Sequence, residues 1–130
     1  MSIEQNKAVS RRWFHDGYGQ GDARAMQELA TGTWLEDASI VAQIEAFHAA
    51  FPDLAVTVDE QIAEGDRVMT RSTWTGTHTG PLFGIEPTAK PFSQSLVEIH
   101  TITGGRIVDR WNDFSPVSIP VQLDVIKPPE

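Results

Sequence analysis

The 130-residue sequence contains no cysteine. Disulfides, thiol nucleophiles and thiolate metal ligands are therefore excluded, whereas the compartment stays open on this ground alone. Long apolar runs are missing too, since none approaches the roughly 18 residues that cross a bilayer as a helix. Residues 1–5 lack the basic and apolar pattern of a signal peptide, so we expect a cytoplasmic protein.

Positive charge is scarce in this chain. Only 10 Lys and Arg residues stand against 18 Asp and Glu residues, which gives a formal net charge of -8. An acidic surface repels phosphate backbones and anionic lipids. We therefore expect neither nucleic acid nor membrane among the partners of the protein.

Several cofactor and nucleophile motifs are also absent from the sequence. The histidines show no His-x-His or His-x3-His spacing and no His-Glu-x-x-His motif, so we expect no metal site. No Gly-x-Gly-x-x-Gly segment follows an expected strand, and no nucleophile elbow is present. These absences argue against a metal site, dinucleotide binding and a Ser-His-Asp nucleophile.

The first 50 residues place apolar side chains at helical spacing. This periodicity predicts helices over residues 3–18, 23–30 and 39–50. Glycines at the end of the first segment favour its termination there. Pro52 cannot continue the third helix, so the chain must change its structure at that point.

The rest of the chain alternates apolar with polar residues, which is typical of strands. Prolines and glycines in residues 80–91 predict a long loop, and we expect residues 126–130 to fray. Helices followed by an antiparallel meander predict one α+β domain over residues 1–130, in which N-terminal helices pack on a strongly curved sheet. The sheet would form a cone with one internal pocket. The predicted strands cover residues 54–59, 67–78, 92–103 and 106–114.

Several short segments in the second half resemble the SnoaL-like polyketide cyclases of the nuclear transport factor 2 superfamily. They keep their order over residues 50–115, about half of the chain, and residues 12–14 and 21–22 resemble the family's first helix more loosely. The resembling segments are residues 50–54 (AFPDL), 64–68 (EGDRV), 76–80 (GTHTG), 83–88 (FGIEPT) and 105–108 (GRIV), followed by Trp111, Asp113 and Phe114.

This resemblance implies a cone-shaped α+β barrel, often dimeric, without a metal or organic cofactor. Well-known members of the family close a ring by an intramolecular aldol reaction on polyketide esters. Residues 31–38 are shorter than the corresponding segment of the family and contain no histidine. For the dimer, we expect an exposed outer sheet face with Met69, Arg71 and Thr73.

An aldol cyclisation needs a base that removes an α-proton and an acid that protonates the developing alkoxide. A carboxylate in an apolar cone suits either task. Asp113 is the candidate, because it lies two residues after Trp111 on the same strand face. His100 is the candidate partner, since the turn at Gly104 brings its strand beside that of Asp113. A strand-end cap for Asp113 and a structural role for His100 are the alternative interpretations.

Other candidates would line the pocket and contact the substrate. Aromatic walls suit a flat or apolar ligand, although simple core packing is an equally ordinary role for them. For the histidines among them, the alternative roles are a turn for His78 and a solvent-exposed position for His48. The predicted substrate-binding residues are Trp13, Phe14, His48, Trp74, His78 and Trp111.

The sequence therefore favours a cofactor-free enzyme that closes a ring on an apolar, polyketide-like small molecule. Other proton-transfer or ring chemistry in the same cone stays open, namely isomerisation, dehydration, epoxide hydrolysis or a pericyclic closure. A homologue that binds a small molecule without catalysis is the alternative of a different class.

Overall fold

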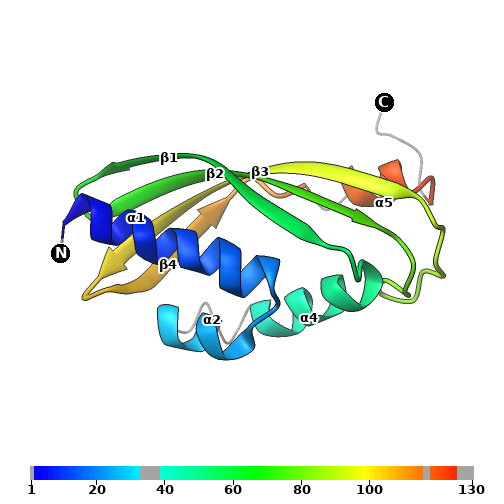
Figure 1. Cartoon of the computed structure of the whole chain (residues 1–130), viewed down its shortest axis with the longest axis horizontal. Helices are drawn as coiled ribbons and strands as arrows, with labels where there is room; N and C mark the ends of the chain where they lie inside the picture. Colours follow the sequence, from blue (N-terminus) through cyan, green and yellow to red (C-terminus); the bar gives the residue numbers. More distant parts are fainter. Residues whose placement is uncertain (1, 33–38, 116–117, 126–130) are drawn as a thin grey trace.

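A four-stranded antiparallel sheet forms one side of the molecule, and helices lie against its concave face (Figure 1). The computed structural model describes residues 2–32, 39–115 and 118–125. This arrangement confirms the predicted α+β class with a curled sheet. Its elements are α1 (Ile3–Arg12), the π-helix η1 (Trp13–Gly19), α2 (Ala23–Leu29), α4 (Ile40–Ala50), β1 (Ala55–Glu64), β2 (Arg67–Thr77), β3 (Pro91–Thr103), β4 (Arg106–Asn112) and α5 (Ser118–Gln122).

The first helix begins with a capping box, in which Ser2 and Gln5 each bind the other's backbone N–H. A single helix was predicted over residues 3–18, but the chain winds as a π-helix from Trp13 onward. The wider π turn joins residues five positions apart by its hydrogen bond and often occurs at functional sites. Here it directs Trp13, Phe14 and Tyr18 into the core, where all three are buried.

The sheet has the simple order β1-β2-β3-β4, so each strand pairs with its neighbour in sequence. Alternate side chains of β2, from Val68 to Trp74, are buried on the concave face. In the observed register Val68 lies opposite His100, and His100 lies opposite Arg110. Because opposite residues share a face, the concave face of β3 and β4 is fixed by this register.

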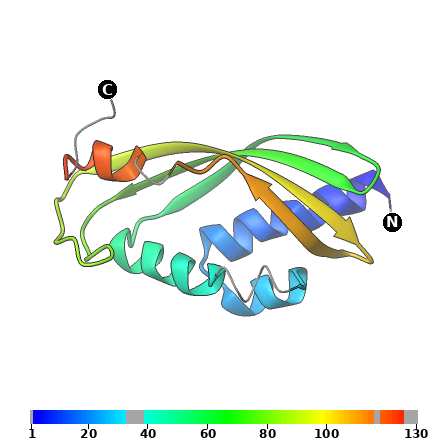
Figure 2. The same ribbon diagram turned by 180° about the vertical axis from the view of Figure 1, so that it is seen from behind.

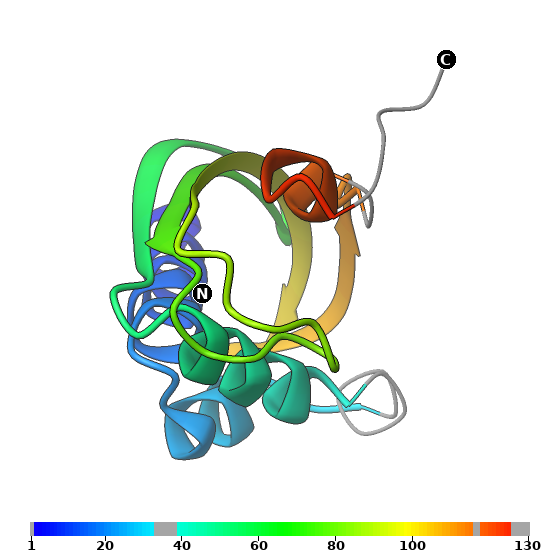
Figure 3. The same ribbon diagram turned by 90° about the vertical axis from the view of Figure 1, so that its right-hand side faces the viewer.

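The sheet is strongly curled, and seen end-on it wraps around the helices (Figure 3). Helix α4 closes the concave side at one end, where Ile40 and Ile44 are buried. At the same end α5 lies over β3 (Figure 2). No helix was predicted after the last strand, so α5 is an element that the sequence prediction missed. Residues 33–38, and residues 126–130, which were expected to fray, lie outside the described part of the chain.

Helix α5 is held to an edge of β3 by Gln122. Its side chain accepts a hydrogen bond from the Ser93 backbone N–H at 2.8 Å and donates one to the Ser93 carbonyl at 2.9 Å. The Gln122 amide thus pairs with the backbone of Ser93 as a neighbouring strand would, at a position of β3 that β4 does not reach. None of the described helices is long and apolar enough to span a membrane.

Candidate active site

A pocket of about 170 Å³ opens on the concave side of the sheet, between α4 and strands β2 to β4. Its walls are mainly apolar, and its polar groups gather on β3 and β4, as expected for a small-molecule site. The pocket is lined by Tyr18, Ile40, Gln43, Ile44, Phe47, Trp74, Phe92, Gln94, Leu96, Glu98, Arg110, Asn112, Phe114 and Ile119.

Glu98 is the centre of the polar end of this pocket. Its side chain is fully buried on the concave face of β3. The Tyr18 hydroxyl lies 3.0 Å from both carboxylate oxygens, and the Asn112 amide donates to Oε1 at 3.3 Å. A buried carboxylate with this many donors is held in one position and is available as an acid/base group.

His100 lies two residues further along the same face and contacts Glu98 directly. Its Nε2 is 2.8 Å from Oε2 of Glu98, and its Nδ1 is 2.8 Å from Oγ of Ser10. All three side chains are buried. The Ser10 hydroxyl can donate to or accept from the ring, so either tautomer of His100 keeps a hydrogen bond at Nδ1.

The Tyr18 phenol lies between the carboxylate and a guanidinium. Burial and then the negative charge of Glu98 raise the pKa of Tyr18 far above its ordinary value. Tyr18 therefore stays protonated and acts as a hydrogen-bond donor to Glu98. The π-helix η1 places this residue, and Trp13 and Phe14 pack edge-on against its ring at centroid distances of 5.3 and 5.2 Å.

Arg110 supplies the positive charge of the cluster. Its Nη1 donates to the Tyr18 hydroxyl oxygen at 2.9 Å and lies 3.5 Å from Oε1 of Glu98. Burial alone would lower the pKa of Arg110, but Tyr18 and Glu98 outweigh it and raise that pKa. The side chain is 20% exposed and lines the pocket beside Glu98.

Three phenylalanines from separate segments pack together beside the other end of the pocket, and two of them, Phe47 and Phe114, line it. The Phe47 ring packs edge-on against Phe83 and Phe114, with centroid distances of 6.3 and 6.5 Å. Phe83 is 70% exposed at the tip of the loop between β2 and β3, and Phe114 is 42% exposed. The mouth of the pocket is therefore aromatic, while its far end is polar.

The structure brings two of the predicted site residues together with the pocket. Trp74 lines it, and His100 lies directly behind Glu98. Trp13 and Phe14 do not line the pocket; their rings pack against His100 at 6.1 and 5.8 Å and hold it from behind. His48 is also behind the site, where its Nε2 lies 2.7 Å from the backbone carbonyl of Tyr18.

The structure places Asp113 and Trp111 outside the pocket. They share a face, as predicted, but it is the outer one, since Trp111 lies opposite the outward-facing Ile99 and is 58% exposed. The Asp113 carboxylate accepts a hydrogen bond from the backbone N–H of Val97 at 2.9 Å. It thereby extends the pairing of β4 with β3 by one residue, which is the alternative role considered above.

His78 is buried at the start of the loop between β2 and β3. Its Nδ1 accepts a hydrogen bond from the backbone N–H of Thr88 at 3.1 Å, and its ring packs on Phe51 at 5.6 Å. The residue thus ties the two ends of the loop together. It does not line the pocket, so the structure places it in the structural role and not beside a substrate.

Sequence reasoning missed four polar residues of the cluster, namely Tyr18, Glu98, Arg110 and Asn112. A signal was present for Glu98, which is two residues before His100 and therefore shares its strand face. Among the described residues, no group of three or more histidines and carboxylates is placed to hold a metal ion. The cluster is instead suited to moving protons, because acid, base and donors surround one point at the end of an apolar cavity.

Comparison with known proteins identifies relatives of the whole fold. A family model described as SnoaL-like polyketide cyclase matches residues 12–123. A search among curated proteins found no significant match.

Solved structures are similar over nearly the whole chain. AclR from Streptomyces galilaeus, a suggested hydroxylase, is 26% identical, with a TM-score of 0.84 over 99% of this chain and 87% of AclR. IdmH from Streptomyces antibioticus, a suggested polyketide cyclase, is 26% identical, with a TM-score of 0.75 over 92% of this chain and 99% of IdmH.

A Catenulispora acidiphila protein with a ketosteroid isomerase-like fold, in complex with trimethylamine, is 15% identical. Its TM-score is 0.66 over 89% of this chain and 92% of that protein. This similarity shows the shared fold alone.

Proposed function

Because the chain belongs to the SnoaL-like polyketide cyclase family, we propose that it is an enzyme that closes a ring by an acid/base aldol reaction, without a cofactor. The observation that carries this proposal is the buried Glu98, bonded to His100 and Tyr18 at the polar end of an otherwise apolar pocket. The substrate would be an apolar small molecule of the polyketide type that carries two carbonyl groups.

Glu98 is the proposed base. Its carboxylate takes a proton from the carbon next to the first carbonyl, and the electrons of that C–H bond form the enolate. The guanidinium of Arg110 and the amide of Asn112 line the pocket beside Glu98 and are placed to stabilise the enolate oxygen.

The second half of the reaction returns the proton. The enolate carbon attacks the second carbonyl of the same molecule, a C–C bond forms, and the carbonyl electron pair moves to oxygen. The resulting alkoxide takes the proton from Glu98, which becomes a carboxylate again. Substrate and product are therefore isomers, and no oxidant or reductant is consumed.

His100 is proposed as the partner that keeps Glu98 ready for both steps. Its Nε2–H can donate to one oxygen of Glu98 both before and after the other oxygen takes the proton, while Nδ1 accepts from the Ser10 hydroxyl. Trp74 and Phe47 are the proposed walls, since their rings lie 6.3 Å apart at the pocket. A flat substrate ring fits against such surfaces.

The proposal is tested by incubating the protein with an aryl-substituted diketone that can form a six-membered ring. We expect a product with the same mass as the substrate, or one water lighter after elimination, formed faster than in buffer. Mass spectrometry after chromatography detects both. If the diketone is recovered unchanged although the protein binds it, ring closure is refuted for this substrate class and the non-catalytic binding interpretation is favoured.

The similarity to AclR supports a second candidate, because that suggested hydroxylase aligns with 99% of this chain. A hydroxylation would yield a product one oxygen heavier than the substrate, and it would need a source of that oxygen. Isomerisation is distinguished in the same experiment, since it gives an unchanged mass without a new ring. Dehydration and epoxide opening need a hydroxyketone and an epoxide as substrates, from which they give the loss or the gain of one water.

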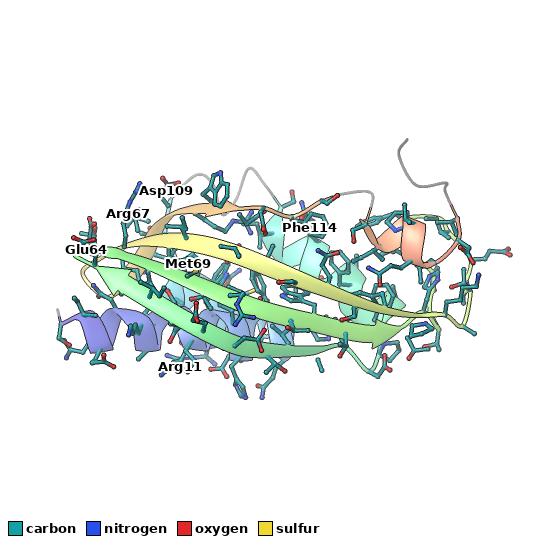
Figure 4. The ribbon with its side chains drawn as sticks, turned by 90° about the horizontal axis from the view of Figure 1, so that it is seen from above. Arg11, Glu64, Arg67, Met69, Asp109 and Phe114 are labelled. Carbon is teal, nitrogen blue, oxygen red and sulfur yellow. The ribbon has the colours of Figure 1, made fainter. Side chains whose placement is uncertain are left out.

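We also propose that the protein is a cytoplasmic homodimer. One row of apolar residues crosses the outer face of the sheet, formed by Ile62, Met69, Ile99 and Trp111, which lie opposite one another in register. Figure 4 shows this face, with Met69 between Arg67 and the middle of the sheet. Light scattering should give twice the chain mass of 14.4 kDa, and Trp111→Lys should give the monomer. A wild-type mass of one chain would refute the dimer.

A further inference from the structure

Gln94 lines the pocket with an acceptor that has no donor. The residue belongs to the concave face of β3, four residues before Glu98. Its Oε1 is buried and makes no hydrogen bond within the described part of the chain. Buried polar atoms are rarely left without a partner, so such an atom in the wall of a binding pocket requires an explanation.

The orientation of the Gln94 amide follows from its other end. Its nitrogen lies 2.9 Å from the backbone carbonyl oxygen of Ser95. A carbonyl can only accept a hydrogen bond, so the nitrogen must be on that side and the oxygen on the other. The hydrogen bond to the Ser95 carbonyl therefore identifies the other atom of the amide, the one without a hydrogen bond, as Oε1.

The surroundings of Gln94 define what a ligand group there must be. Trp74 lies directly opposite Gln94 on β2, so an aromatic surface adjoins the unpaired oxygen. Leu96 separates Gln94 from Glu98 along the strand, and four residues of strand span about 13 Å. The pocket thus has a charged polar end at Glu98 and a neutral acceptor well away from it, with apolar walls between.

We propose that Gln94 selects substrates that carry a hydroxyl group on a flat ring, which rests on Trp74 and donates its hydrogen bond to Oε1 of Gln94. The nitrogen is held by Ser95, and the oxygen has no hydrogen bond among the described residues, so the acceptor is available to a ligand with the amide as it stands. This inference rests on the proposed function in one respect, namely that the pocket takes a small molecule. It narrows the substrate class from apolar compounds in general to hydroxylated, phenol-like rings.

The pocket should discriminate strongly between ligands with and without this hydroxyl, because a ligand without it leaves the Gln94 acceptor unsatisfied. Sites that pair a buried acceptor with a substrate O–H reject the analogue without it, whereas apolar pockets scarcely distinguish the two. A wholly apolar wall offers no gain for the hydroxyl of β-naphthol, which loses its hydration on binding. A preference for β-naphthol is therefore diagnostic of a polar partner in the wall.

Equilibrium dialysis with β-naphthol and naphthalene tests this inference directly. We expect the wild type to bind β-naphthol about tenfold more tightly, and Gln94→Met to abolish the preference because methionine has similar size but no comparable acceptor. Glu98→Gln is the matched comparison, since the naphthol could otherwise donate to that carboxylate. The preference should persist in Glu98→Gln.

Equal affinities in the wild type would overturn the inference without any variant being made, and so would a preference that survives in Gln94→Met but is lost in Glu98→Gln. Should Gln94→Met fail to fold by circular dichroism, Gln94→Leu and the wild-type comparison still decide. The measurement involves binding alone. A failure of the ring-closing assay would leave it standing, and a failure here would leave Glu98 as the proposed base.

Discussion

Ionisation of Tyr18 gives a sharp test of the buried cluster. It is the only tyrosine of the chain, so tyrosinate absorbance reports on this one side chain. Burial, followed by the charge of Glu98, raises the pKa of Tyr18. We therefore predict that no tyrosinate forms in the folded protein at pH values where free tyrosine, with a pKa of about 10, ionises.

The effect on stability follows from the direction of that shift. A pKa raised in the folded state means that the folded chain holds the proton more tightly than the unfolded chain does. The resulting stabilisation is complete below pH 10 and is lost as the pH rises further. At a pH of about 11 the free energy of unfolding should be about 1.4 kcal/mol lower than at neutral pH through this group alone.

Comparison with Tyr18→Phe isolates this contribution, because lysines and other groups titrate equally in both proteins. Urea unfolding at neutral pH and at a pH of about 11 should show the wild type losing about 1.4 kcal/mol relative to the variant. In Glu98→Gln tyrosinate should appear at lower pH, since one cause of the raised pKa is removed. Reversible tyrosinate formation near pH 10, with the circular dichroism of the fold intact, would show that Tyr18 is not sealed in the cluster.

Three further predictions concern other contacts. Ser10→Ala should lower kcat for the proposed reaction and Ser10→Thr should restore it in steady-state assays, because the hydroxyl orients His100. Gly80→Ala should lower the melting temperature seen by circular dichroism, since a Cβ there would lie 2.0 Å from the Ala49 carbonyl oxygen. A backbone hydrogen bond from Thr77 lowers the pKa of Asp53, so acid should destabilise Asp53→Asn less steeply than the wild type in urea titrations below pH of about 4.

The order of helices and strands was predictable because alternation and helical periodicity report local packing faces. The π-helix could not be predicted in this way. The change from α-helix to π-helix at Trp13 depends on how the rings of Trp13 and Tyr18 pack against the sheet, which the spacing of apolar residues does not report. Helix α5 was missed because Pro120 lies within it; a proline is tolerated there, in a first turn that needs no backbone donor.

Only some of the site residues could be predicted from the sequence, because the alternation within a strand shows which residues share a face but not which face turns inward. Trp74 and His100 were chosen as candidates and both are buried on the concave side, although the alternation of residues in β3 did not by itself decide which face of that strand turns inward. Which face of β4 turns inward depends on its register with β3, and that register includes an irregularity between Thr101 and Ile102. Asp113 therefore fell on the outer face, and Glu98, flanked by Val97 and Ile99, was hidden in a strand with apolar residues on both faces.

Deuterium exchange into β-tetralone most directly tests whether Glu98 is the base. This flat ketone has acidic α-protons, and NMR in D₂O measures their replacement without any ring closure. We predict exchange above the buffer rate for the wild type, a loss of about 10²-fold or more in Glu98→Gln, and near wild-type exchange in Asp113→Asn, which makes the same chemical change on the outer face. Full exchange by a folded Glu98→Gln protein, or its loss in Asp113→Asn, would contradict the account.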